Sequence, residues 1–236
     1  MELREKKQKR CAAEERDAAG DQWDHTAVAA DSKLVVSLRV GKRTYEHTLA
    51  LVQDAKDRLR PGHLPAIFTD ACASYESALL EVFGRRYPAT GRSRRPVIRW
   101  RQGLAYGQVK KSDKRGRVDR VEVRAVHGKA HLEHVLYLLG YTQINTSVVE
   151  RHNGTSRLRN QRKVRKTLAF SKALRYHRWM SWLSVGLYNF CQPHSSLRIK
   201  QDSQVIHRSP AMAAGLTEHL WSIREWLLTP AHGGQG

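Results

Sequence analysis

Short apolar segments alternate with amphipathic helical segments over residues 23–83, and this alternation restricts the fold to the mixed α/β class. The turn pair Asp31 and Ser32 separates the first two extended runs, which predicts a β-hairpin. Ser74 is placed to cap a later helix and Gly84 to end it. The expected elements are strands over 23–30, 34–40 and 66–70 and helices over 45–59 and 74–83.

Further elements are expected in the second half of the chain. Residues 85–104 are rich in Arg, Pro and Gly without periodicity, which predicts an exposed basic loop with no core of its own. Ser147 and Glu150 have the spacing of a capping box at the start of a helix. Apolar residues between 216 and 227 predict a C-terminal helix that packs on the core or on another protomer. The other expected elements are a hairpin over 105–111 and 117–126 and helices near 130–139 and over 172–189.

Positive charge is concentrated in the middle of the chain. The sequence carries 42 Lys and Arg against 22 Asp and Glu, a formal net charge of +20. Residues 85–149 hold 15 basic and 4 acidic side chains, and residues 150–201 hold 12 and 1. A localised positive field of this size attracts a polyanion, and nucleic acid is the commonest polyanion in a cell. A solvated basic face is the plain alternative, but it explains a few residues better than a span this long.

Other features exclude several classes of protein. Three cysteines with no CxxC spacing argue against a disulfide framework or a zinc cluster and fit a reducing cytosol. No apolar run approaches the roughly 20 residues that a membrane span needs, and the polar N-terminus differs from a signal peptide. The sequence therefore predicts a cytoplasmic protein that does not act at a membrane.

Two acidic residues stand out by their positions. Asp70 ends a predicted strand, where open α/β sheets place their ligands, although an aspartate there also caps turns. Glu150 is the only acidic residue between Glu133 and Asp202, and it opens a helix surrounded by cations. From geometry alone, a capping role explains Asp70 as well as catalysis does, and it explains Glu150 better.

The combination of these residues suits phosphodiester chemistry. In such sites carboxylates hold two Mg²⁺ or Mn²⁺ ions roughly 4 Å apart, because these hard cations prefer oxygen ligands. At about 100° per residue, Glu150, Asn153 and Arg157 project from one face of a helix. Arg157 is then placed to neutralise a phosphate group near the ions.

Long segments in a fixed order resemble the DDE transposases of small bacterial insertion sequences. They are GDQWDHTAVAADSKLVVSLRVGKRTYEHT, FTDACASY, INTSVVERHNGTSRLRNQRKVRKTLAFSK, YNFCQPHSSL and SPAMAAGLTEHLWSIREWL. The resemblance covers nearly the whole chain. It implies a ribonuclease H-like catalytic domain, in which helices flank a mixed central sheet, with Mg²⁺ or Mn²⁺ as cofactor. It also implies cutting and joining of insertion-sequence ends and target DNA by a homo-oligomer at the nucleoid.

The resemblance also assigns roles to single residues. Asp70 corresponds to the second catalytic aspartate of the family and Glu150 to its catalytic glutamate, and both would bind the metal ions. Arg157 corresponds to a basic residue that contacts DNA. Tyr188 and Asn189 resemble a stretch that follows the catalytic helix in related transposases, where packing is the plainer role. Further DNA-binding residues implied in this segment are Arg151, Asn153, Arg159, Arg162, Lys163, Arg165 and Lys166.

The front of the chain departs from the family pattern. The first catalytic aspartate of the family stands just before a Lys-Lys-x-Lys run, and residues 6–9 resemble that run. None of the residues in this chain matches that aspartate, and Asp24 is a weak substitute. Loss of one carboxylate predicts weak ion binding and impaired strand transfer. The implied domains are a basic remnant of the first strand region over 1–20, a catalytic domain over 21–201 with a basic insertion at about 85–128, and a C-terminal helix and tail over 202–236.

Two alternatives remain open from the sequence. A non-catalytic nucleic-acid-binding protein explains the basic blocks, but it gives no reason for Asp70 or for a lone Glu150 among cations. A different ribonuclease H-like nuclease or a Holliday-junction resolvase keeps the metal ions and changes the substrate. The segments YNFCQPHSSL and AMAAGL favour the transposase over these enzymes.

Overall fold

Two compact units make up the chain. The computed structural model describes residues 20–89, 95–114, 117–164, 169, 171 and 173–229. The sheet unit consists of the described residues within 25–27 and 39–151, and the helical unit consists of those within 1–24, 28–38 and 152–236. Each unit is therefore assembled from segments that are distant in the sequence.

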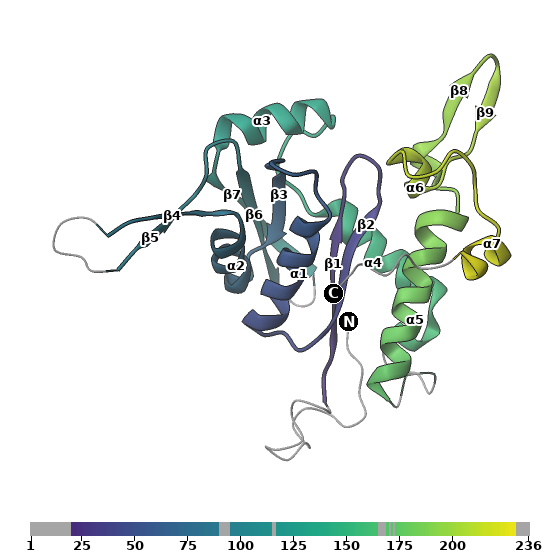
Figure 1. Cartoon of the computed structure of the whole chain (residues 1–236), viewed down its shortest axis with the longest axis horizontal. Helices are drawn as coiled ribbons and strands as arrows, with labels where there is room; N and C mark the ends of the chain where they lie inside the picture. The colour runs from purple at the N-terminus through teal and green to yellow at the C-terminus, as the bar shows by residue number, and fades with distance from the viewer. Residues whose placement is uncertain are drawn as a thin grey trace. The chain divides into compact units, whose positions relative to one another are not determined.

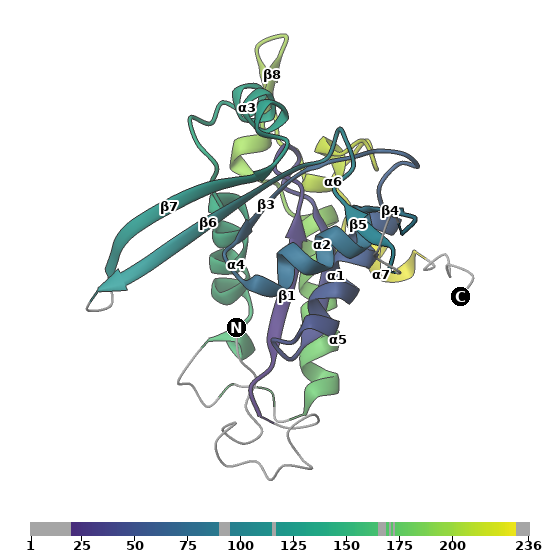
Figure 2. The ribbon, with the colours of Figure 1, turned by 90° about the vertical axis from the view of Figure 1, so that its left-hand side faces the viewer.

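A three-stranded mixed sheet forms the centre of the sheet unit (Figure 1). Strand β3 (Ala66–Asp70) pairs in parallel with β6 (Ala105–Lys114), and β6 pairs antiparallel with β7 (Arg117–His127). The β6–β7 hairpin continues well past β3 (Figure 2). The predicted strand over 66–70 and the predicted second hairpin are confirmed, although the hairpin strands are longer than expected.

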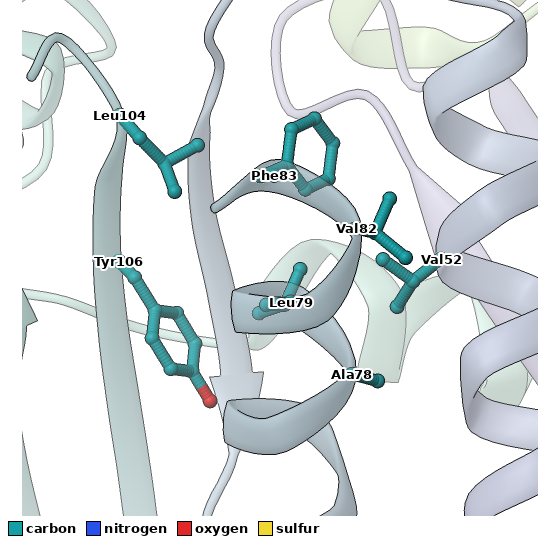
Figure 3. Close-up of a cluster of buried hydrophobic side chains, with 7 residues drawn as sticks. All are labelled: Val52, Ala78, Leu79, Val82, Phe83, Leu104 and Tyr106. Atoms are coloured by element: carbon teal, nitrogen blue, oxygen red, sulfur yellow. The ribbon is translucent and has the colours of Figure 1, made fainter. Parts of the chain in front are cut away.

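Helices cover both faces of this sheet. Helices α1 (Tyr45–Asp57) and α2 (Ala73–Phe83) lie on one face, where Leu79 of α2 faces Tyr106 of β6 in a buried cluster that also holds Phe83 (Figure 3). Helix α3 (Lys129–Leu138) lies on the other face. The second cluster, between α3 and the sheet, consists of Ala105, Val109, Leu132, Leu136 and Ile144, with Ala66, Phe68 and Tyr141 at its margin. The protein thus has the mixed α/β architecture that the sequence predicts.

The other strands of the described residues form two-stranded sheets. The predicted first hairpin is confirmed as β1 (Trp23–Val28) and β2 (Val35–Gly41), whose residues are divided between the two units. The short paired strands are β4 (Arg85–Tyr87) with β5 (Val97–Arg99) and β8 (Ile199–Gln201) with β9 (Gln204–Ile206).

The helical unit holds most of α4 and the elements that follow it. Helix α4 (Ser147–Arg159) begins in the sheet unit and enters the helical unit at His152. Helix α5 (Leu174–Gly186) continues into a π-helical turn over Leu187–Cys191. The other helical segments are 3₁₀ turns over Gln161–Lys163 and Ser195–Leu197 and the short helices α6 (Pro210–Ala213) and α7 (Ile223–Leu228). In the described residues, no helix has the length and apolar character that crossing a membrane requires.

Two predictions about irregular regions are wrong. The span 85–104 is not only a loop, because it contains β4 and β5, and Leu104 is 1% exposed in the core beside α2. The helix predicted between 216 and 227 is present only as α7 (Ile223–Leu228), and the other short helix, α6 (Pro210–Ala213), precedes that span. Gly215, with φ of +71°, stands between them in the left-handed conformation that ends α-helices.

Candidate catalytic carboxylates and the basic segment

Asp70 is the last residue of β3, and its side chain is 59% exposed. Its Oδ1 accepts a hydrogen bond from the backbone N–H of Cys72 at 3.2 Å, and its Oδ2 lies 3.9 Å from Nη2 of Arg43. The contact with Cys72 is the turn-capping role that the sequence allowed. A carboxylate has about four lone-pair sites, so this exposed group retains acceptor capacity for a further ligand.

Glu150 lies in the first turn of α4, and its side chain is 49% exposed. Its Oε1 accepts hydrogen bonds from Nζ of Lys111 and from Oγ1 of Thr146, each at 2.5 Å. Partial burial acts to raise the pKa of Glu150, but these hydrogen bonds and the charge of Lys111 outweigh it and bring the pKa below its usual value. Glu150 is therefore ionised at neutral pH, and neither hydrogen bond uses its Oε2.

Strand β6 lies next to Asp70 and also contacts Glu150. Asp70 pairs with Val109 of β6 in parallel register, and Lys111 lies two residues further along β6. Because side chains alternate along a strand, Asp70, Val109 and Lys111 share a face. Val109 packs in the cluster beside α3, so this is the face that α3 covers. Lys111 binds Glu150 within the same unit.

The donor set fits a hard divalent cation in kind. Carboxylate oxygens are the ligands that Mg²⁺ and Mn²⁺ prefer, and both side chains are open to solvent. No cluster of three or more His, Cys, Asp or Glu suited to a metal ion is found among the described residues. Asp70 and Glu150 alone would hold an ion weakly, because each is also faced by a cation.

Lys111 lowers the pKa of Glu150, and this effect can be measured. Replacing Lys111 by methionine removes one hydrogen bond and one positive charge from the Glu150 carboxylate. The pKa of Glu150 is then expected to rise toward its usual value. Carboxyl ¹³C chemical shifts followed through a pH titration report the Glu150 group. An unchanged pKa of Glu150 would mean that the Lys111 contact does not exist in solution.

The residues expected to contact DNA differ in how the structure places them. Arg151, Arg157 and Arg159 of α4 and Arg162 of the following 3₁₀ turn are exposed, and Asn153 is half-buried. Arg165 and Lys166 lie outside the described residues. Lys163 does not belong to this surface, because it is 3% exposed and its Nζ is bonded within the unit. Its prediction as a DNA contact is therefore corrected.

Asp24 is engaged in a buried polar network of the helical unit. Its Oδ2 lies 2.7 Å from Nζ of Lys163, and its Oδ1 accepts a hydrogen bond from Nε2 of His177 at 2.8 Å. Ser181 donates to Oδ2 at 3.4 Å, and Lys163 also donates to Ser156 at 2.9 Å. Both oxygens of Asp24 thus already serve cations or polar donors, which leaves it poorly suited to replace a catalytic aspartate.

The segment after α5 packs within the helical unit, which is the plainer role that the sequence suggested for Tyr188 and Asn189. Asn189 donates to the carbonyl of Val35 and accepts from its N–H, each at 3.0 Å, so its amide pairs with a backbone. Tyr188 donates to the carbonyl of Lys33 at 3.1 Å.

Comparisons of the chain with protein-family models, with curated proteins and with solved structures found no match. The geometry of the carboxylates and the distribution of charge are therefore what bear on function.

Proposed function

We propose that the protein is a DDE-type transposase of a bacterial insertion sequence, acting on element ends and target DNA at the nucleoid. Its mixed α/β fold would be of the ribonuclease H-like kind. The observation that carries the proposal is that Asp70 ends β3 beside β6, and that β6 also binds Glu150 through Lys111, although the two acidic residues are distant in the sequence. The strongly basic middle of the chain supports a DNA substrate.

The residues divide the chemistry among them. A bound Mg²⁺ or Mn²⁺ would make a hydroxyl a better nucleophile and stabilise the oxygen that leaves phosphorus. Asp70 and Glu150 would supply its protein oxygens, and the hydrogen bond from Lys111 holds the Glu150 carboxylate in position. Arg157 and Arg159 would neutralise the phosphates of the bound strand. Further copies of the chain would join in the complex that pairs two ends.

Cleavage of duplex DNA tests this proposal. Purified protein is incubated with Mn²⁺ or Mg²⁺ and a duplex that carries the ends of the encoding element. We expect slow nicking and strand joining, because the described residues supply two carboxylates and not three. Asp70→Asn should abolish both products without changing duplex affinity, and Asp119→Asn, at an exposed position of β7, should change neither. Nicking that survives Asp70→Asn would contradict the proposal.

The second candidate is a non-catalytic nucleic-acid-binding protein. It is favoured by the contacts of the two carboxylates, since Asp70 caps a turn and Glu150 forms an ion pair, and both roles stabilise structure alone. In that case Asp70→Asn and Glu150→Gln would leave DNA binding and any response to Mn²⁺ unchanged. A metal-dependent nuclease or resolvase would instead cut without joining strands.

A further inference from the structure

Helix α5 of the helical unit buries polar side chains and exposes aromatic ones, which is the opposite of what is expected for a helix that only packs. Its buried residues are His177, Ser181 and Val185, and two of these three are polar. Its two tryptophans point outward, with Trp179 63% and Trp182 43% exposed. A tryptophan buries a large apolar area when it packs, so leaving two of them in water forfeits stability. Such a surface calls for a ligand.

The exposed aromatic residues form one surface with arginines. Arg175, Trp179 and Trp182 follow one another at i, i+4 and i+7, so they lie in one row along α5. Tyr176, 45% exposed, meets Trp179 edge-on at 5.5 Å between ring centroids. The guanidinium of Arg175 lies 4.9 Å from the centre of the Tyr176 ring. We call these residues, with the exposed Arg178, the α5 aromatic face.

The buried side of α5 holds this face in a fixed position. His177 and Ser181 both bond to Asp24, and Asp24 is tied in turn to Lys163. Asp24 is 5% and His177 1% exposed by side chain, so the network is closed to water. The polar residues that face inward thus anchor the helix, and the rings outside can offer flat surfaces at low cost in conformational freedom.

Charge selects the kind of partner. No acidic residue occurs between Glu150 and Asp202, whereas this span holds 12 Lys and Arg. Exposed tryptophans and tyrosines interleaved with arginines are suited to unpaired nucleobases, which stack on rings while their phosphates meet the cations. Paired bases inside a duplex present no free faces for stacking. We infer that the α5 aromatic face, which belongs to the helical unit, binds single-stranded or unpaired nucleotides by stacking.

Binding of a labelled oligothymidylate of about 12 nucleotides tests this inference, with a mixed-sequence duplex as the comparison. By fluorescence anisotropy, Trp179→Ala and Trp182→Ala should each weaken oligothymidylate binding by about 5-fold to 100-fold. Duplex affinity should change by less than about twofold. Trp179→Phe should retain most of the affinity, because a phenyl ring still stacks. Tyr137→Ala, which removes an aromatic side chain 80% exposed on α3, is the matched control and should have no effect.

Three results would overturn the inference. One is unchanged oligothymidylate affinity in both tryptophan variants, and another is an equal loss of duplex and single-strand affinity, which would indicate general damage or simple charge binding. The third is a change in oligomeric state by analytical ultracentrifugation with DNA binding intact, which would assign the face to a protein partner. DNA cleavage is measured separately with Asp70→Asn, so failure of the stacking surface and failure of the proposed transposase activity are distinguishable.

Discussion

Replacing Asp24 by asparagine is expected to lower the free energy of unfolding by about 3–5 kcal/mol, which is the typical cost of removing one partner of a buried ion pair. The side chains of Asp24 and Lys163 are 5% and 3% exposed. Asparagine keeps the shape of the side chain and loses its charge. The Lys163 ammonium is then left buried without a counter-charge, and His177 loses its anionic acceptor. Urea denaturation followed by circular dichroism measures the change.

The same network gives the stability a dependence on pH. Burial acts to raise the pKa of Asp24, but the hydrogen bond from His177 and the charge of Lys163 outweigh it, so the pKa falls from 3.8 to about 2. A pKa that is lower in the folded state stabilises the fold above the unfolded value, and this stabilisation is lost as the pH falls through about 2. The stability difference between the wild type and Asp24→Asn should therefore shrink as the pH falls from about 4 to 2.

A double variant separates the ion pair from general damage to the core. Combining Asp24→Asn with Lys163→Met removes both charges, so the pair of changes should cost less than the sum of the single ones. Asp119→Asn, at an exposed position of β7, should change stability by no more than about 0.5 kcal/mol. A loss below about 1 kcal/mol for Asp24→Asn would mean that water reaches Lys163 in solution.

Local signals in the sequence correctly predicted that Asp70 ends a strand and that Glu150 lies near the start of a helix. The apolar run before Asp70 predicts a strand that ends there, and the structure ends β3 at that residue. The helix that opens near Glu150 is confirmed as α4. These features depend on a few neighbouring residues, so periodicity and turn chemistry are sufficient to find them.

These local signals could not predict contacts between residues that are distant in the sequence. Lys111 binds Glu150 across 39 residues, and His177 binds Asp24 across 153. Nothing in the spacing of either pair marks it, because the chain path between them is set by the sheet and by helix packing. Lys163 shows the consequence, since its place in a basic run suggested a DNA contact and the fold buries it.

One short pattern occurs twice and forms a capping box only once. Ser222 and Glu225 bond reciprocally at the start of α7, as the Ser-x-x-Glu spacing predicts. At Ser147 the pattern fails, because its N–H and hydroxyl both donate to Asn145. Glu150 is taken instead by Lys111 and by Thr146. The capping explanation of Glu150, which geometry favoured in the sequence, therefore does not hold, and the carboxylate is bound by Lys111 of β6.

Replacing Glu150 by glutamine is expected to slow metal-dependent nicking by about 10²-fold to 10³-fold, the usual cost of losing one electrostatic contact to a transition state. Glutamine offers a neutral oxygen in nearly the same shape, so α4 should keep its structure while the pull on a divalent cation weakens. Titration with Mn²⁺ should show a correspondingly lower affinity for the ion. Duplex affinity should change little or rise slightly, because the variant removes a negative charge from a basic segment.

The control for this variant is Glu133→Gln, which removes another exposed helical carboxylate paired with a lysine, Lys129 on α3. It should leave nicking and Mn²⁺ binding unchanged. Glu150→Gln combined with Asp70→Asn should be no slower than the worse single variant, because two ligands of one ion act as a unit and their losses do not add. Independent, multiplying losses would place Asp70 and Glu150 in separate sites, and equal nicking rates for the wild type and Glu150→Gln would remove Glu150 from the chemistry.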